Sequence, residues 1–339
     1  MKTLLSVKDC ENLKLSEIQK IYKKNVSKSI VNLYEAFSFG NELIKKAEGQ
    51  YIFTKSGKKI LDFTAGLGVL NMGHNNRDII KERIKFQNKQ KMEVYKNFLS
   101  PYIAGLSKNL SELIPGDLNY SFFCNSGAEA IDGSIKISYK FHKGKRKYIL
   151  HSDRSFHGKL LGSLSVSESQ RKFEFPKIPN TKKFKFNDIK SLKRLVKILR
   201  KKNGESDIYA IIVEPFSASS VDKCDKEFLH EARRITAKNN IVLIFDEIYT
   251  GFYKTGKLFY YLKYNINPDV LAISKSLGGG KSSISGYISA NKIALKSYDN
   301  INDALLHSTT YNGFGEECVT AITSINEMIK NRYDLKSLE

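Results

Sequence analysis

From Tyr120 onwards, short apolar runs alternate with longer stretches in which apolar residues recur at helical spacing. Apolar runs of this length indicate buried strands, and the helical spacing indicates amphipathic helices that cover them. The predicted strands are residues 120–124, 148–151, 209–214, 241–246, 269–274 and 286–290, and the predicted helices are residues 127–141, 188–202 and 225–239. This alternation predicts an α/β domain whose mostly parallel central sheet has helices on both faces.

The N-terminal part of the chain follows a different pattern. Residues 1–45 are polar with apolar positions at helical spacing, so we expect helices there. Two β-prone runs, residues 49–54 and 59–63, flank a short turn and predict a β-hairpin. After a glycine-rich loop the pattern becomes helical again, and helices are predicted at residues 77–92 and 101–114.

The charge balance is strongly basic, with 56 lysines and arginines against 35 acidic residues and a net charge of +21. A basic surface is one feature of nucleic-acid-binding proteins. The lysine clusters at residues 143–147, 182–183 and 193–202, however, lack interleaved aromatic residues and any zinc-finger or RRM pattern. We interpret them as the lysine-rich surface of an ordinary globular protein, so nucleic acid is not an expected partner.

Other bulk features favour a cytoplasmic enzyme without a metal. No apolar run is long enough to cross a membrane, and the apolar start of the chain is too short for a signal-peptide core. The four cysteines lie far apart and form no CxxC pair, which indicates neither a zinc site nor a disulfide framework.

The predicted strand at residues 269–274 ends at Lys275, and the glycines Gly278 to Gly280 follow shortly after. An amine that is partly withdrawn from water binds its proton less tightly, and the neutral amine can condense with an aldehyde. Glycines let the backbone approach a bulky ligand closely. A strand that ends at a solvated lysine would show the same pattern, so this stretch is informative only together with the other strand ends.

Two further strand ends carry residues suited to binding a ligand. Asn125 to Ala130 follow a strand and begin a helix, where free N–H groups and the helix dipole can hold a phosphate. A simple helix cap made by Ser126 and Glu129 is the alternative. Phe156 follows the next strand and can stack on a flat ring, although core packing would also explain an aromatic residue there.

Asp246 ends a strongly apolar strand, and a buried carboxylate at that position needs a partner. A protonated pyridine nitrogen would serve, because a neighbouring anion favours the charged ring. Metal binding or a helix cap would also explain a carboxylate there. The segment Gly280-Lys281-Ser282 resembles the end of a nucleotide-binding loop, but Lys275 occupies the position where that loop requires its first glycine.

A phosphate cradle, an aromatic ring, a buried aspartate and a lysine follow one another along this chain. Pyridoxal 5'-phosphate (PLP) needs these groups as phosphate anchor, ring stack, counter-ion for the ring nitrogen and Schiff-base amine. The hydroxyl groups around Thr310 could also reach a phosphate, although a Ser/Thr-rich turn before the last predicted helix would contain the same residues.

With these motifs the sequence resembles the class III aminotransferases. This branch of the fold type I PLP-dependent enzymes includes ornithine and 4-aminobutyrate aminotransferases and glutamate-1-semialdehyde aminomutase. The resemblance extends from about Gly49 to about Lys330, and residues 123–130, 156–158, 214–215, 246–256, 275–280 and 309–311 carry it. It implies the large domain of a fold type I PLP-dependent transferase.

The resemblance implies two catalytic residues. Lys275 would hold PLP as a Schiff base and, once displaced, would carry the proton shift. Asp246 would pair with the pyridinium nitrogen and keep the ring an electron sink. Glu214 matches a family glutamate on the substrate side.

The resemblance also implies how the cofactor is held. Ser126, Gly127 and Ala128 would bind the phosphate, and Phe156 would stack on the ring. In this family a threonine matching Thr310 reaches the phosphate from the neighbouring subunit, so a homodimer with shared active sites is expected.

The sequence departs from the family pattern in two places. Tyr249 stands where the family usually has a glutamine near the ring hydroxyl of the cofactor, and its phenol can still form a hydrogen bond there. The family also continues into a C-terminal small domain, which usually supplies an arginine for the substrate carboxylate, whereas this chain ends at Glu339. We expect a fragment, although a second polypeptide or a substrate without that carboxylate would also fit.

The expected organisation is an N-terminal helical segment and β-hairpin at residues 1–62, a PLP-binding large domain at residues 63–330, and the start of a linker at residues 331–339. The expected reaction is ping-pong transfer of an amino group, often a terminal one, between an amine or amino acid donor and an oxo-acid or aldehyde acceptor. An aminomutase on the same scaffold would keep every cofactor residue but need no external acceptor. A truncated PLP-binding protein without activity, or a basic RNA-binding scaffold with a vestigial PLP site, would also account for part of the pattern.

Overall fold

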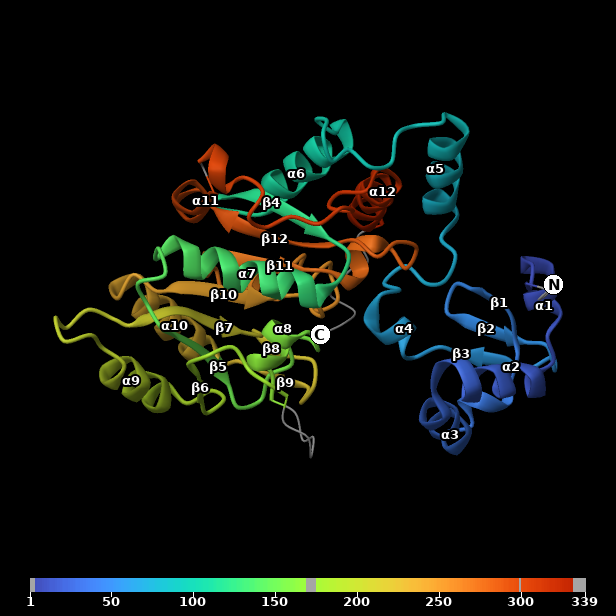
Figure 1. Cartoon of the computed structure of the whole chain (residues 1–339), viewed down its shortest axis with the longest axis horizontal. Coiled ribbons are helices and arrows are strands. Elements are labelled where there is room, and N and C mark those ends of the chain that lie inside the picture. Colours follow the sequence, from blue (N-terminus) through green and yellow to red (C-terminus); the bar gives the residue numbers. More distant parts are fainter. Residues whose placement is uncertain (1–3, 169–174, 299, 332–339) are drawn as a thin grey trace. The chain divides into compact units, whose positions relative to one another are not determined.

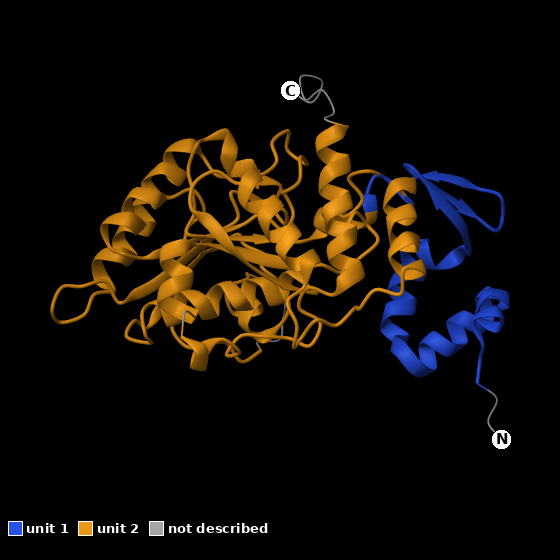
Figure 2. Ribbon diagram, turned by 90° about the horizontal axis from the view of Figure 1, so that it is seen from above, with its two compact units in different colours: residues 1–65, 73–75 blue, residues 66–72, 76–339 orange. Residues whose placement is uncertain are grey.

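The computed structural model describes residues 4–168, 175–298 and 300–331. The chain divides into two compact units, which Figure 2 distinguishes by colour. The N-terminal unit comprises residues 1–65 and 73–75, and the large unit comprises residues 66–72 and 76–339. The expected start of a linker at residues 331–339 lies, except for Asn331, outside the described residues.

The N-terminal unit combines short helices with a small antiparallel sheet. Its helices are α1 (Val7–Asn12), α2 (Leu15–Tyr22), the π-helical η1 (Lys23–Ser27), α3 (Lys28–Ala36) and the 3-10 turn η2 (Phe39–Asn41). The sheet has the order β1-β2-β3 and consists of β1 (Ile44–Glu48), β2 (Tyr51–Thr54) and β3 (Lys59–Leu61). The predicted hairpin therefore forms, but β1 extends it at residues that we expected to be partly helical or unpaired.

The large unit is built on a seven-stranded sheet (Figure 1). Its strands are β4 (Leu118–Cys124), β5 (Tyr148–Ser152), β6 (Thr181–Phe184), β7 (Ile208–Val213), β10 (Val242–Asp246), β11 (Val270–Ile273) and β12 (Ser285–Ala290). They lie in the order β4-β12-β11-β10-β7-β5-β6, and β12 runs antiparallel to both of its neighbours. A separate two-stranded ribbon joins β8 (Phe216–Ser217) to β9 (Asp222–Lys223). Six of the seven strands match predicted ones, and β6 was missed.

From residue 65 onwards, helices alternate with these strands along the chain. They are α4 (Ala65–Gly68), α5 (Arg77–Asn88), α6 (Pro101–Leu113), α7 (Gly127–Phe141), α8 (Leu161–Ser165), α9 (Ile189–Ile198), α10 (Lys226–Lys238), α11 (Asn291–Tyr298) and α12 (Gly315–Lys330), with the 3-10 turns η3 (Tyr260–Lys263), η4 (Lys275–Gly278) and η5 (Ile301–Asp303). Figure 1 shows α7 lying across one face of the sheet. None of the described helices is long and apolar enough to cross a membrane.

The centre of the sheet is covered on both faces. Every residue of β7, β10, β11 and β12 is buried. Because successive side chains of a strand point to opposite faces, this burial requires a layer on each side, as in other α/β sheets. Since β4, β5, β7, β10 and β11 run in the same direction, the residues that follow them meet at one edge, where such sheets bind ligands.

Candidate active site

A pocket lies at this carboxyl edge of the sheet. It is lined by Gly127, Ala128, Phe156, His157, Gly158, Glu214, Ala218, Asp246, Ile248, Tyr249, Ser274 and Lys275. The lining residues follow, or end, five strands that are far apart in sequence. The structure therefore brings together Gly127, Ala128, Phe156, Glu214, Asp246, Tyr249 and Lys275 from the residues predicted for the site, whereas Ser126 and Thr310 do not line the pocket.

Lys275 is the first residue of η4, separated from the end of β11 by Ser274 alone, and its backbone has a positive φ of 48°. Burial lowers the pKa of its amine below the ordinary lysine value, while the carboxylates of Asp246 and Glu214 oppose this shift. Its Nζ atom lies 5.0 Å from the centre of the Tyr249 ring. The lysine is therefore a half-buried amine that faces two acidic groups and an aromatic ring.

Asp246 ends β10 and is buried. Its Oδ2 atom lies 2.7 Å from Nδ1 of His157, and its Oδ1 atom accepts a hydrogen bond of 3.0 Å from the N–H of Ile248. Asp246 thus caps the following turn, which is not the helix that the sequence also allowed, and it also lines the pocket. Sequence reasoning left His157 out of the site, although its position directly after Phe156 was a usable signal.

Glu214 follows β7 and is held by two backbone groups. The N–H of Phe156 donates to its Oε1 atom at 2.8 Å, and the N–H of Ala218 donates to its Oε2 atom at 3.2 Å. Burial raises the pKa of this carboxyl group, and the nearby Asp246 raises it further, while His157 lowers it. Glu214 therefore fixes the loop that carries Phe156 and lies close to Asp246.

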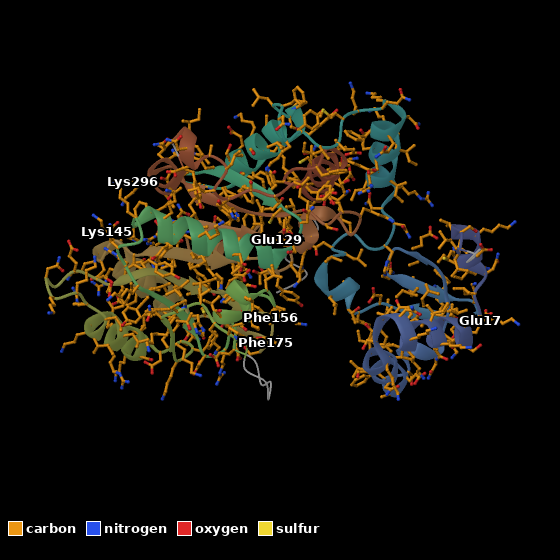
Figure 3. All side chains as sticks on the ribbon, in the orientation of Figure 1. Glu17, Glu129, Lys145, Phe156, Phe175 and Lys296 are labelled. Carbon is orange, nitrogen blue, oxygen red and sulfur yellow. The ribbon has the colours of Figure 1, made fainter. Side chains whose placement is uncertain are left out.

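Phe156 stays accessible at the pocket wall. This residue is 40% exposed, whereas the neighbouring Ser155 and His157 are buried. Figure 3 labels Phe156 and also Glu129, which lies in the first turn of α7. An accessible ring at a pocket wall can stack on a planar ligand.

Ser126 caps α7 beside the pocket. Its hydroxyl accepts a hydrogen bond of 3.3 Å from the N–H of Glu129 and donates one of 2.8 Å to the Glu129 carboxylate. The helix cap that the sequence allowed is therefore present. The first N–H groups of a helix have no partner within that helix, so the residues at this end, Gly127 and Ala128, can still hold an anion. Thr310 lies in an exposed turn before α12.

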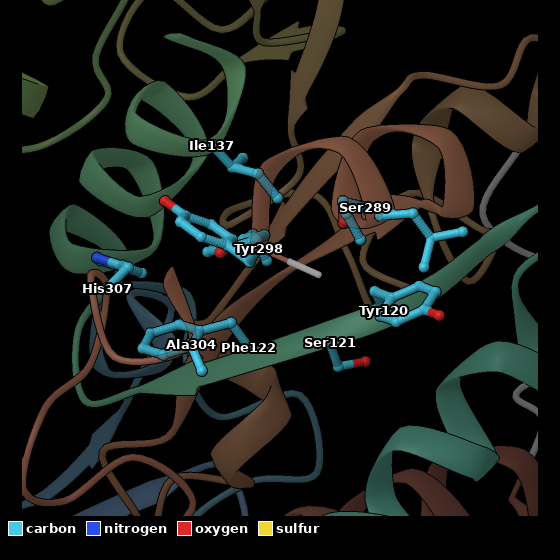
Figure 4. Close-up of a pocket in the computed structure, with 11 residues that line it drawn as sticks. Tyr120, Ser121, Phe122, Ile137, Ser289, Tyr298, Ala304 and His307 are labelled. Carbon is cyan, nitrogen blue, oxygen red and sulfur yellow. The ribbon is translucent and has the colours of Figure 1, made fainter. Parts of the chain in front are cut away.

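A second pocket lies beside β4 and β12 (Figure 4). Its walls are mainly aromatic and small residues: Tyr120, Ser121, Phe122, Ile137, Tyr287, Ser289, Ala294, Leu295, Tyr298, Ala304 and His307. Its lining contains no lysine and no carboxylate. It therefore offers neither the amine nor the acid that the first pocket brings together.

Comparison with known proteins decides the family. The family model of the class-III aminotransferases matches residues 38–337. The chain belongs to the class-III aminotransferase family. It is 35% identical over 318 residues to an acetylornithine aminotransferase from Prochlorococcus marinus subsp. pastoris, a match that covers 91% of this chain and 72% of that protein. The chain is accordingly a PLP-dependent aminotransferase, as the motifs predicted.

Solved structures agree with this assignment. An (S)-enantioselective omega-transaminase from Thermomicrobium roseum superposes with a TM-score of 0.82 at 25% identity, covering 94% of this chain and 76% of the other. The ornithine aminotransferase of Toxoplasma gondii ME49 superposes with a TM-score of 0.82 at 21% identity, and the match covers 98% of this chain and 76% of that protein. The second likeness concerns the fold alone. Together they confirm the predicted fold type I architecture.

The residues of the first pocket suit PLP. A Cβ atom on Gly127 would lie 3.0 Å from Cδ1 of Ile248, so the side chain of Ile248 packs closely against the start of α7 and favours glycine there. Among the described residues, Asp246 forms an ion pair with His157 and with no lysine or arginine. A buried carboxylate without such a partner is well placed to accept a proton-bearing ring nitrogen.

Proposed function

We propose that this aminotransferase uses Lys275 as its reactive amine and Asp246 as the partner of the cofactor's ring nitrogen. The observation that carries the proposal is their position in one pocket, which the start of α7 and the Phe156 ring also line. When bound, PLP supplies an aldehyde that condenses with primary amines and a protonated ring that accepts electrons.

Lys275 has two tasks in this proposal. Its Nζ atom, with a pKa lowered by burial, supplies the neutral amine that reacts with an aldehyde. With a donor amine in its place, the free Nζ atom would take the proton from the donor carbon and deliver it to the carbon of the former aldehyde. Lys275 has a positive φ of 48° in the turn that follows β11, and its side chain lines the pocket.

Asp246 and His157 act together on the ring nitrogen. The Asp246 carboxylate holds the proton on that nitrogen, because an adjacent anion favours the charged ring. His157 keeps the carboxylate in place through its Nδ1 atom, 2.7 Å away. Phe156 and Tyr249 line the pocket, where the Phe156 ring would stack on the cofactor and the Tyr249 phenol would hydrogen-bond to its ring hydroxyl.

The start of α7 binds the phosphate in this proposal. The N–H groups of Gly127 and Ala128 supply the donors, the hydroxyl of Ser126 would join them by turning its proton away from the Glu129 carboxylate, and the helix dipole favours the negative charge. We further propose a homodimer in which Thr310 of a second copy reaches the same phosphate. The exposed position of Thr310, away from the pocket of its own chain, supports this arrangement.

The substrates that we propose are a donor with a terminal primary amine and an oxo-acid acceptor. The similarity to an acetylornithine aminotransferase supports an amino acid donor of that kind. Glu214 lies on the substrate side of the pocket. Its raised pKa means that this carboxyl group can be neutral in the protein, so it repels a substrate carboxylate less than an ordinary glutamate would.

Substitution of Lys275 tests the assignment. K275A should lack the visible absorbance that bound PLP gives the wild-type protein. It should also no longer transfer amino groups from a panel of terminal amines to 2-oxo acids. K292A, which changes a lysine of α11 beside Phe141, is the matched control and should keep both. Borohydride reduction and peptide mapping should place the cofactor on Lys275. Wild-type absorbance in K275A would refute the assignment.

A further inference from the structure

A second lysine lies beside this pocket without lining it. The Nζ atom of Lys254 donates hydrogen bonds of 2.6 Å to the carbonyl of Gly68 and 3.0 Å to the hydroxyl of Ser276. Ser276 directly follows Lys275 in η4. Lys254 therefore ties together two segments of the large unit, and one of these begins with the reactive lysine.

Lys254 and Lys275 contact the same ring. Their Nζ atoms lie 5.2 Å and 5.0 Å from the centre of the Tyr249 ring. Burial lowers the pKa of Lys254 to about 7, and the positive charge of Lys275 contributes to this shift. Among the ion pairs of the described residues, none includes Lys254, so the protein keeps this half-buried amine with neutral hydrogen-bond partners. Such a costly placement indicates a role for the side chain.

The backbone around Lys254 is also unusual. Phe252 and Tyr253, the two residues before it, have positive φ angles of 64° and 66°. Non-glycine residues rarely adopt this conformation, and it persists where surrounding contacts enforce it. On the opposite side, a Cβ atom on Gly68 would lie 2.9 Å from Cε2 of Tyr249, so only glycine lets the carbonyl and the ring approach so closely.

A hydrogen-bond network closes this arrangement. The Ser276 hydroxyl lies 2.6 Å from Oδ1 of Asn71, and the side-chain amide of Asn71 donates to the carbonyl of Phe252. Phe252, Lys254, Gly68, Asn71 and Ser276 thus form one connected set behind the Tyr249 ring. These hydrogen bonds link the start of η4 to the segment that carries the Tyr249 ring at the pocket wall.

We propose that Lys254 is a positioning residue of the cofactor site, which holds the Tyr249 ring and the turn that begins at Lys275 in the geometry that captures PLP. The inference rests on the proposed assignment of Lys275 and Tyr249 to that site. Lys254 acts through these two residues and does not itself touch the reacting atoms.

Three variants test the proposal. K254M removes the donors and keeps the length of the side chain, whereas K254R keeps a cation with donors. K263M is the matched control, because Lys263 also lies against a tyrosine, 5.5 Å from the Tyr260 ring, but outside the pocket. The measurements are the PLP dissociation constant, the pH midpoint of the visible absorbance of the bound cofactor, and the melting temperature.

The expected result is a dissociation constant about tenfold higher in K254M, with a displaced pH midpoint, because loss of a buried hydrogen-bond donor weakens the site by roughly this factor. K254R should recover most of the affinity, and K263M should behave like the wild type. If K254M does not fold, S276A removes one of the two hydrogen bonds and should give a smaller change in the same direction. Wild-type affinity and midpoint in K254M, or in S276A in its place, would overturn the proposal.

Borohydride reduction separates this inference from the proposed function. Peptide mapping of the reduced wild-type protein should find the cofactor on Lys275, and so should mapping of K254M at saturating PLP. A wild-type protein labelled elsewhere contradicts the assignment of Lys275. A label on Lys275 combined with unchanged binding in K254M contradicts the role of Lys254 alone.

Discussion

The Nδ1 atom of His157 lies 2.7 Å from Oδ2 of Asp246, and both side chains are buried. Replacing His157 with phenylalanine leaves this carboxylate oxygen without its partner, which costs about 1–3 kcal/mol for a buried polar group. We expect H157F to melt at a lower temperature and to bind PLP about tenfold more weakly. Absorbance titration and thermal unfolding measure the two effects.

His151 supplies the control for this prediction. It is also buried, and its Nδ1 atom lies 3.0 Å from the carbonyl of Ser152, but it does not line the pocket. H151F should lower the melting temperature and leave PLP affinity near the wild-type value. Equal PLP affinity in H157F and H151F would contradict the role given to His157.

The exposed ring of Phe156 provides a second prediction. Stacking between aromatic rings contributes roughly 0.5–1.5 kcal/mol beyond the area that the rings bury. F156A should therefore weaken PLP binding by about tenfold, whereas F156Y, which keeps a stacking ring, should stay within about twofold. F98A changes a phenylalanine that is 66% exposed and outside the pocket, and it should have no effect. Loss of affinity in F156Y as large as in F156A would exclude stacking as the cause.

The burial of Glu247 should make the free energy of unfolding depend on pH. It is completely buried, and its carboxylate accepts hydrogen bonds from the N–H groups of Tyr260 at 3.0 Å and Tyr261 at 2.8 Å. Burial raises the pKa of Glu247 from 4.5 to about 7. The folded state therefore binds this proton more tightly than the unfolded state, so stability falls as the pH rises from about 4.5 to 7.

E247Q removes the ionisable group and with it this contribution, which is on the order of 3 kcal/mol. Glutamine loses one acceptor at every pH, so E247Q should be less stable than the wild type at pH about 5. The difference in the free energy of unfolding between the wild type and E247Q should shrink or reverse by pH about 8. Chemical denaturation at the two pH values measures the free energy of unfolding. E227Q, at an exposed position of α10, is the control, and a difference that does not change with pH would refute the prediction.

Substitution by alanine should affect stability differently at two glycines, Gly286 and Gly105. A Cβ atom on Gly286 would collide with the carbonyl oxygen of Phe122 on the neighbouring strand, and a strand backbone cannot move aside easily. G286A should lower the free energy of unfolding by about 1–3 kcal/mol. In α6, a Cβ atom on Gly105 would meet Cδ1 of Ile322 at an ordinary 3.7 Å, so G105A should be neutral or stabilising by up to ~1 kcal/mol. Thermal melts of both variants would be compared, and a tolerated G286A would show that β12 and β4 are packed less closely.

The central strands were predictable because burial on both faces makes a strand apolar throughout, as in β7 and β10. β6 lacks this signal. It lies at the end of the sheet, and Lys182 and Lys183 are exposed while Phe184 is buried, so only one apolar residue marks it. β1 was missed for a similar reason, because three of its five residues are charged.

The pocket was predictable to the extent that its residues follow strands. Lys275, Asp246 and Phe156 stand at or after strand ends, and parallel strands bring such positions to one edge. Lys254 was not predictable in this way. Its partners are a backbone carbonyl at Gly68 and a serine hydroxyl, and neither carries a pattern that links it to a lysine so far along the chain.

The position of β12 sets the order in which the pocket can be assembled. β12 lies between β4, which leads into the start of α7, and β11, which is followed by Ser274 and Lys275, and the hydroxyl groups of Ser274 and Ser285 are 2.6 Å apart. During synthesis, β4 and β11 leave the ribosome first, but they have no shared backbone pairing until β12 has inserted between them. Tight cofactor capture should therefore begin only after residues 285–290 have emerged, which a series of stalled nascent chains would reveal.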